Sequence, residues 1–130
     1  MAEPLRDIRP AFSLEKRNYI VTGGAQGIGL GVVRAIAEFG GNVAVLDVKE
    51  RALEEYEKLA DRFGVRTIYI QTDVSSEESL THAFDKAVDF LGSVDGAFTS
   101  AGIAIDKPFV EQTWNEALKI QQVNVCLSMQ

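Results

Sequence analysis

Residues 22–29 read Thr22-Gly23-Gly24-Ala25-Gln26-Gly27-Ile28-Gly29. The apolar run 19–21 before them predicts a strand over about 18–22, and apolar residues spaced by three and four predict a helix from about Gly27 to the Gly40-Gly41 pair. The expected buried face of that helix is Ile28, Val32, Ala35, Ile36 and Phe39. The glycines therefore lie on a strand-to-helix turn. Free backbone N–H groups and the positive end of the helix favour an anion at such a turn.

Several glycine motifs can be compared with this turn. It is not the common dinucleotide fingerprint G-x-G-x-x-G, because position 32 is Val. It is not a P-loop, because no Gly-Lys-Ser/Thr follows. An S-adenosylmethionine-dependent transferase is an alternative, since Gly27-x-Gly29-x-Gly31 is similar to the G-x-G-x-G of that fold, but these glycines lie inside the helical pattern. A glycine-rich loop without a ligand is the other alternative. The strand, the helix and the spacing together favour a phosphate-binding turn.

The composition excludes several classes of protein. A length of 130 residues, with 46% hydrophobic and 25% charged residues, is typical of one globular domain. A net charge of −6 argues against a nucleic-acid partner. No apolar run approaches the roughly 20 residues of a membrane span, and no secretory signal is visible. The single cysteine, Cys126, cannot form an internal disulfide, so we expect a cytoplasmic protein. The one histidine, His82, lies off the apolar stripe of its helix, and we expect no metal site.

Strands and helices alternate along the rest of the chain. Residues 1–13 are expected to form an N-terminal arm. Further strands are predicted at 42–46, about 66–71 and 94–99. Three more helices are predicted, with apolar faces Leu53-Tyr56-Leu59-Phe63, Leu80-Phe84-Ala87-Leu91 and Trp114-Leu118-Val125-Met129. The capping boxes Ser75-x-x-Glu78 and Thr113-x-x-Glu116 are expected to open the last two.

This alternation predicts an α/β fold: a Rossmann-type parallel sheet with helices on both faces, truncated after about four strands and four helices. The expected strand order is 3-2-1-4. Ligands bind at the carboxyl ends of such strands, where the glycine turn, Asp47, Asp73 and 100–102 all lie. The last strand would have an open apolar edge, which predicts self-association.

The pattern Thr-Gly-x-x-x-Gly-Ile-Gly directly after a strand resembles the cofactor turn of the short-chain dehydrogenase/reductase family. The resemblance covers nearly the whole chain after the arm, and implies that residues 14–130 are the dinucleotide-binding (Rossmann) half of an NAD(P)-dependent oxidoreductase. Such an enzyme exchanges a hydride between a small carbonyl compound or secondary alcohol and the nicotinamide. The cofactor-binding residues that the resemblance implies are Thr22, Gly23, Gln26, Gly27, Ile28, Gly29, Asp47, Asp73, Val74, Ser100, Ala101 and Gly102. The family also implies a homo-oligomer.

The resemblance assigns roles to four places. Asp47 implies NAD rather than NADP, because a carboxylate accepts hydrogen bonds from the adenosine ribose and repels a 2′-phosphate. Asp73-Val74 implies an adenine contact. Thr99-Ser100-Ala101-Gly102 stands where the family usually has Asn-Asn-Ala-Gly. Asn124 stands at the place of the catalytic-tetrad Asn, which supports a proton-relay water. The structural alternatives are a helix-terminus carboxylate for Asp47, a turn residue for Asp73 and an ordinary helix residue for Asn124.

The family's catalytic Tyr, followed four residues later by Lys, is not in this sequence. Tyr19, Tyr56 and Tyr69 are followed at that distance by Gly23, Ala60 and Asp73. We therefore expect a cleaved, truncated or alternatively spliced form, inactive by itself. A non-catalytic nucleotide-binding module is the alternative function.

Overall fold

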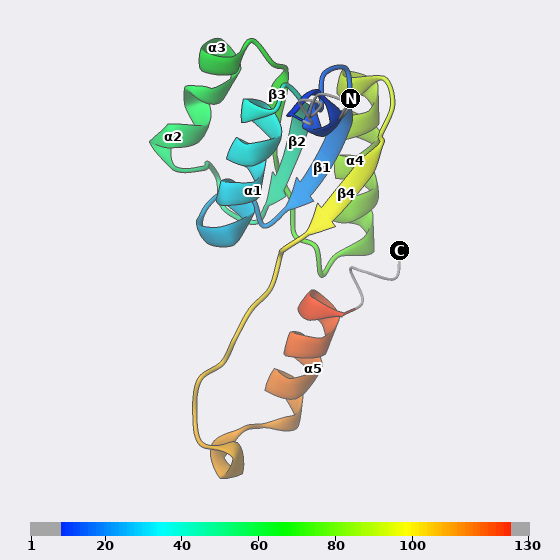
Figure 1. Ribbon diagram of the computed structural model, residues 1–130. Helices are drawn as coiled ribbons and strands as arrows, with labels where there is room; N and C mark the ends of the chain where they lie inside the picture. The colour runs from blue at the N-terminus through cyan, green and yellow to red at the C-terminus, as the bar shows by residue number, and fades with distance from the viewer. Residues whose placement is uncertain (1–8, 126–130) are drawn as a thin grey trace, which may run out of the picture.

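The computed structural model describes residues 9–125 and has a four-stranded parallel sheet at its centre (Figure 1). The strands are β1 (Asn18–Thr22), β2 (Asn42–Asp47), β3 (Thr67–Gln71) and β4 (Gly96–Thr99), in the order β3-β2-β1-β4. Thr22 pairs with Leu46 and with Thr99, and Asp47 pairs with Gln71. The carboxyl ends of all four strands therefore meet at one edge of the sheet. The predicted α/β parallel sheet and its strand order are confirmed.

Helices cover both faces of the sheet. In chain order they are α1 (Gly27–Glu38), α2 (Glu54–Glu57), α3 (Leu59–Phe63), α4 (Glu77–Leu91) and α5 (Trp114–Asn124), with short 3₁₀ turns η1 (Arg9–Phe12) and η2 (Phe109–Glu111). Val21 and Val45 pack under α1, α2 and α3, whereas Ile20 and Leu46 pack under α4. Successive side chains of a strand point to opposite faces, so β1 and β2 are apolar throughout because both faces are buried.

The buried face of α1 differs from the expected one. Leu30, Val33, Ile36 and Ala37 are buried, whereas Ile28 is 79% exposed and Phe39 is 51% exposed. Apolar residues lie on more than one side of this helix, so their spacing alone does not single out the packed side. The packed side is the one that faces Val21, Val43 and Val45 of the sheet, and it includes Gly29, which lies directly against the Gly23 carbonyl.

Two further details of the helices correct the sequence prediction. The single helix expected over 53–63 is divided into α2 and α3 at Lys58, and Leu53 is 55% exposed. The N-cap of α4 is Ser76, whose hydroxyl accepts from the Ser79 N–H, so the Ser75-x-x-Glu78 box does not form. Ser75 is instead engaged by the carboxylate of Asp73.

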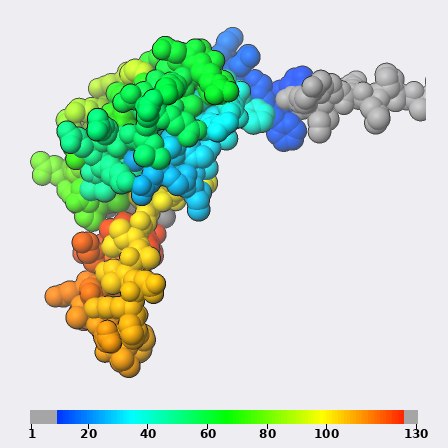
Figure 2. All heavy atoms as spheres, turned by 90° about the vertical axis from the view of Figure 1, so that its left-hand side faces the viewer, coloured from blue at the N-terminus to red at the C-terminus, as the bar shows by residue number. Residues whose placement is uncertain are grey.

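Segment 101–125 projects from the body formed by the sheet and α1–α4 (Figures 1 and 2). Within α5, Val123 is buried, whereas the expected apolar face is exposed: Trp114 by 77%, Leu118 by 44% and Val125 by 43%. Met129, the fourth residue of that face, lies outside the described residues, as do residues 1–8 of the expected arm. β4 is an edge strand with exposed Phe98, and association through this edge stays a prediction.

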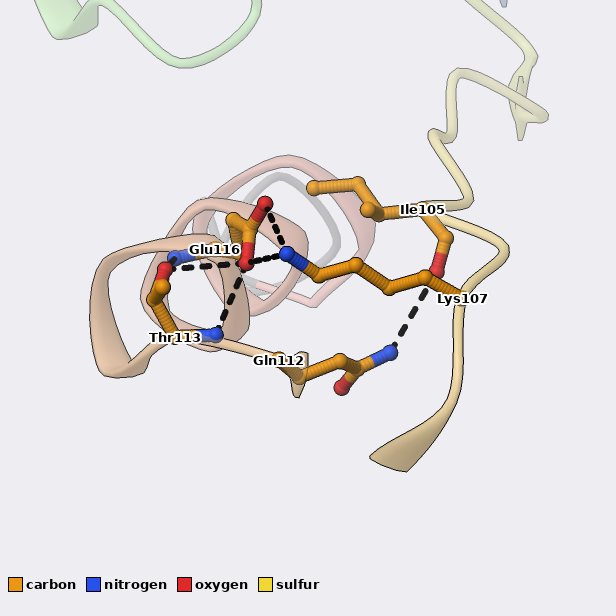
Figure 3. Close-up of polar contacts among 5 residues, drawn as sticks. All are labelled: Ile105, Lys107, Gln112, Thr113 and Glu116. Atoms are coloured by element: carbon orange, nitrogen blue, oxygen red, sulfur yellow. Dashed lines mark hydrogen bonds and ion pairs between the residues drawn. The ribbon is translucent and has the colours of Figure 1, made fainter. Parts of the chain in front are cut away.

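The predicted capping box of α5 is confirmed. Thr113 and Glu116 cap each other, and the Lys107 ammonium lies 2.6 Å from the same carboxylate (Figure 3). The hydrogen bond from Lys107 and the two from Thr113 lower the pKa of Glu116 to about 2. Gln112 donates to the Ile105 carbonyl at 3.3 Å. These contacts join the middle of the loop between β4 and α5 to the start of α5.

Among residues 9–125, no helix is both long enough and apolar enough to cross a membrane.

At two positions of the glycine turn, neighbouring backbone leaves no room for a side chain. Gly23 has φ +68°, and a Cβ there would lie 2.7 Å from the Ala101 backbone. A Cβ on Gly29 would lie 2.1 Å from the Gly23 carbonyl oxygen and 2.6 Å from Ser100 Oγ. The start of α1, the end of β1 and the end of β4 therefore meet backbone against backbone.

Polar side chains cross the sheet at the opposite, amino ends of the strands. Asn42 Nδ2 donates to Asn18 Oδ1 at 2.9 Å, and the Arg66 N–H donates to Asn42 Oδ1 at 2.9 Å. Asn18 also donates to Ser93 Oγ at 3.0 Å and, through its backbone N–H, to Asp95 Oδ2 at 2.8 Å. This network fixes the relative positions of the four strands at the end remote from the glycine turn.

We expect Gly29→Ala to lower the free energy of unfolding by about 1–3 kcal/mol, because the added methyl group overlaps backbone that has no room to move. Urea unfolding measures this change. Gly31→Ala is the matched control in the same helix, since a Cβ there meets no atom within 4 Å. Alanine favours a helix over glycine, so the control should be neutral or stabilising. Equal stabilities of the two variants would contradict the packing argument.

Asp95→Asn should destabilise the protein near neutral pH and matter progressively less below about pH 4. Hydrogen bonds from the Arg17 guanidinium and the Asn18 N–H lower the pKa of Asp95 from its ordinary 3.8. The contribution of a carboxylate with a lowered pKa is complete above the unfolded-state pKa and is lost as the pH falls through the folded-state pKa. Urea unfolding at several pH values measures the difference, with Asp89→Asn on the exposed side of α4 as control. A difference between wild type and Asp95→Asn that does not vary with pH would refute this role.

Candidate functional site

A cleft of about 530 Å³ lies at the carboxyl ends of the four strands. The glycine turn, the ends of β2, β3 and β4 and the last turns of α5 surround it. Every predicted cofactor residue lines it except Thr22: Gly23, Gln26, Gly27, Ile28, Gly29, Asp47, Asp73, Val74, Ser100, Ala101 and Gly102. Its volume is within the range of about 300–1,000 Å³ that is usual for small-molecule sites.

The N-terminus of α1 opens into this cleft without a side-chain cap. Leu30 donates the first hydrogen bond of the helix, to the Gln26 carbonyl, so the N–H groups of residues 27–29 have no acceptor within α1. Within residues 9–125, no side chain accepts at this N-terminus, and its first turn has no acidic residue. The other two long helices, α4 and α5, are capped by Ser76 and Thr113. α1 is thus the long helix whose terminus is left open for an anion.

Asp47 is buried at the end of β2, and both of its carboxylate oxygens are hydrogen-bonded to backbone. Oδ2 accepts from the Ala25 N–H at 2.9 Å, and Oδ1 accepts from the Lys49 N–H at 3.0 Å. A carboxylate has about four acceptor positions, so two of them remain for another donor. The side chain therefore braces the glycine turn and still lines the cleft.

Asp73 lines the cleft from the end of β3 and also shapes the chain that leads into α4. Its Oδ1 accepts from the Ser75 N–H at 2.9 Å and from the Ser75 hydroxyl at 2.6 Å. These hydrogen bonds, with a smaller effect from the charge of Lys119, lower the pKa of Asp73. The turn role considered for this residue is thus present, and it leaves Oδ2 for the cleft.

Thr22 lies beneath the cleft and joins β1 to the end of β4. Its carbonyl accepts from the Ser100 hydroxyl at 2.7 Å and from the Ser100 N–H at 3.2 Å. Its own hydroxyl accepts from the Ala101 N–H at 3.3 Å. The Ser100 hydroxyl therefore links the two strands at a position where the resembling family usually has asparagine.

Asn124 does not line the cleft. Its Oδ1 accepts from the Ile103 N–H at 2.8 Å, and its Nδ2 donates to the Ile103 carbonyl at 3.0 Å. The Asn124 side chain thus joins α5 to the segment that follows β4. The two residues of α5 that line the cleft are Lys119 and Val123.

Several lining residues were missed by the sequence analysis: Val48, Lys49, Thr72, Ser75, Ile103, Lys119 and Val123. Most are immediate neighbours of the predicted residues, so proximity in sequence is the signal that could have identified them. Lys119 and Val123 lie four residues apart on one side of α5, and only the fold reveals which side faces the cleft. The Lys49 ammonium group donates to Gln26 Oε1. This hydrogen bond joins two residues that line the cleft together with Asp47.

Comparison with known proteins agrees with this geometry. The family model described as enoyl-(acyl carrier protein) reductase matches residues 23–129. The L-2,3-butanediol dehydrogenase of Corynebacterium glutamicum is 36% identical over 108 residues, which are 82% of this chain and 42% of that enzyme. Many further curated proteins also match this chain.

Solved structures share the fold over almost the whole chain. An NADPH-dependent 3-quinuclidinone reductase from Rhodotorula rubra has a TM-score of 0.85 and 29% identity, over 99% of this chain and 49% of that one. An NAD⁺-bound xylitol dehydrogenase has a TM-score of 0.81 and 28% identity, over 89% of this chain and 45% of that one.

The chain spans about half the length of the curated relatives it matches, and that half includes the glycine turn and the other strand ends around the cleft. The family model covers most of the 130 residues, and the relatives are dehydrogenases and reductases. The chain belongs to the short-chain dehydrogenase/reductase family of oxidoreductases.

Proposed function

We propose that the cleft binds a nicotinamide dinucleotide, with NAD(H) preferred to NADP(H). The bound nicotinamide would exchange a hydride with a small carbonyl compound or secondary alcohol. The observation that carries this proposal is the uncapped N-terminus of α1, which opens into the same cleft as the buried carboxylate of Asp47. The free N–H groups at the N-terminus of α1 suit a diphosphate, and the carboxylate of Asp47 suits the two hydroxyls of a ribose.

The residues of the glycine turn fit a diphosphate. The N–H groups of residues 27–29 point out of the start of α1, and the helix dipole adds a partial positive charge there. Gly27 has φ +57°, and a Cβ on it would meet no atom within 4 Å. The space in front of Gly27 is therefore open to a ligand, whereas Gly29 is required by packing inside the protein.

The adenosine end would lie along the ends of β2 and β3. The two acceptor positions left on Asp47 suit the ribose hydroxyls. Asp73 Oδ2 suits the adenine amino group, with Val74 beside it and 100–102 on the opposite wall. NADP(H) is the second candidate, because Lys49 lines the cleft next to Asp47 and the quinuclidinone reductase is NADPH-dependent. Asp47 is buried and fixed by two backbone groups, whereas Lys49 is exposed and bound to Gln26, so we favour NAD(H).

Asp47→Asn should weaken NAD⁺ binding by about 1–3 kcal/mol, because charge-assisted hydrogen bonds to the ribose become neutral ones. NADP⁺ should lose less or gain, since the repulsion of its 2′-phosphate is removed. Isothermal titration calorimetry with both nucleotides measures the ratio of the two dissociation constants. Glu50→Gln is the matched control. It removes the same charge from a side chain that lies three residues after Asp47 and does not line the cleft. Tighter binding of NADP⁺ than NAD⁺ by the unaltered chain would refute the proposed preference.

These 130 residues hold no complete set of groups for the proton transfer that accompanies the hydride transfer. No tyrosine is followed four residues later by lysine. Asn124, the family's tetrad position, has its amide engaged by Ile103. We propose that groups outside this stretch supply the proton and the substrate walls in the whole enzyme. A non-catalytic nucleotide-binding module is the alternative function of the chain.

The 130-residue polypeptide should bind the dinucleotide and show no turnover of simple alcohols or ketones. The missing groups account for this. General acid–base catalysis is worth about 10²- to 10⁴-fold in rate, and orientation of the substrate against the nicotinamide is worth about 7–11 kcal/mol of the barrier. An absorbance assay for reduced nicotinamide tests this, on protein whose mass confirms that it ends at Gln130. Turnover that Asn124→Ala abolishes would mean that another group in this stretch transfers the proton.

A further inference from the structure

Two side chains of β3 hold the exposed segment that follows Asp47. Gln71 Nε2 donates to the Val48 carbonyl at 3.1 Å, and the Tyr69 hydroxyl donates to the Lys49 carbonyl at 2.9 Å. Val48 and Lys49 are exposed and belong to no helix or strand. The carbonyls of Val48 and Lys49 are thus held by side chains of β3 and not by backbone hydrogen bonds between paired strands.

The same segment holds the carboxylate of Asp47. The Val48 carbonyl and the Lys49 N–H belong to one planar peptide group, which accepts from Gln71 at one end and donates to Asp47 Oδ1 at the other. Tyr69 fixes the next peptide group along the chain. The other oxygen of Asp47 accepts from Ala25 in the glycine turn. A continuous series of hydrogen bonds therefore runs from β3 through the carboxylate to the nucleotide turn.

We propose that Gln71 and Tyr69 are positioning residues for the nucleotide: by fixing the 48–49 peptide they direct the unused acceptor positions of Asp47 toward the ribose. This inference rests on the proposed NAD(H) function. Neither side chain is needed in the cleft itself, since neither lines it. Burial and the nearby charge of Asp47 raise the pKa of Tyr69 to about 12, so its hydroxyl remains a donor throughout an ordinary assay range.

The chain offers a matched control. Tyr56 packs edge-on against Tyr69, with ring centroids 5.7 Å apart, in the same apolar cluster. Tyr56→Phe and Tyr69→Phe each remove one hydroxyl group from neighbouring rings, but only the second removes a tether of the segment after Asp47. Gln71 is exposed, so Gln71→Ala tests the other tether with little risk to the fold.

The first measurement is the pair of dissociation constants for NAD⁺ and NADP⁺. Tyr69→Phe and Gln71→Ala should each weaken NAD⁺ binding about 3- to 10-fold, as expected for one hydrogen bond, and NADP⁺ binding less. Tyr56→Phe should leave the ratio of the two constants unchanged. In the Asp47→Asn background the effect of Tyr69→Phe on that ratio should vanish, because both substitutions act through one carboxylate. A loss that affects both nucleotides equally, or that persists in Asp47→Asn, would overturn the inference.

The second measurement needs no nucleotide. Amide hydrogen exchange at Lys49 and Ala25 should be faster in Tyr69→Phe and Gln71→Ala than in Tyr56→Phe, because the carboxylate that accepts from both amides is less firmly held. Unchanged exchange in both variants would overturn the tethering. Failure of the unaltered chain to bind either nucleotide would overturn the proposed function and this inference together. Binding by the unaltered chain with both variants equal to Tyr56→Phe would overturn this inference alone. If Tyr69→Phe does not fold, Gln71→Ala decides.

Discussion

Backbone contact between the glycine turn and the end of β4 is the constraint on which the cleft depends. Side chains at Gly23 or Gly29 would overlap the Gly23 carbonyl, Ser100 or Ala101. Because both positions are glycine, α1 starts directly against the carboxyl ends of β1 and β4. The open helix terminus and the loop after β4 then become adjoining walls of one cleft. Loss of this close approach would separate the walls, so packing and ligand geometry have the same origin.

Asp47 shows that a structural and a binding role can reside in one side chain. A buried carboxylate must be hydrogen-bonded, since leaving it unpaired is costly. Here two backbone N–H groups meet that need, one on each oxygen. The remaining acceptor positions are held in a fixed direction at no further entropic cost. The bracing role of Asp47 and the proposed ribose contact are therefore compatible, and the bracing supports the contact.

The sequence predicted best what is encoded locally. Continuous apolar runs placed β1 and β2 within a residue, and the alternation of strands with helices indicated a parallel sheet. The lining residues at the strand ends were predicted from the family resemblance and from the rule that ligands bind at the carboxyl ends of parallel strands. The buried side of α1 could not be predicted in this way. Ile28 and Leu30 are equally apolar, and only the tertiary packing of the helix decides which of them is buried. The cap of α4 moved to Ser76 because Asp73 engages Ser75, a competition between neighbours that a capping motif does not describe.

α5 illustrates how a helix can belong to a site without belonging to the core. Its largest apolar side chains, Trp114 and Leu118, are exposed, and its loop is held by the Glu116 contacts and by two hydrogen bonds between Asn124 and Ile103. Yet these contacts are sufficient to bring Lys119 and Val123 to the cleft wall. The position of that wall therefore depends on the Asn124 amide as well as on the burial of Val123. Through Ile103, which itself lines the cleft, the Asn124 amide couples α5 to the segment that follows β4.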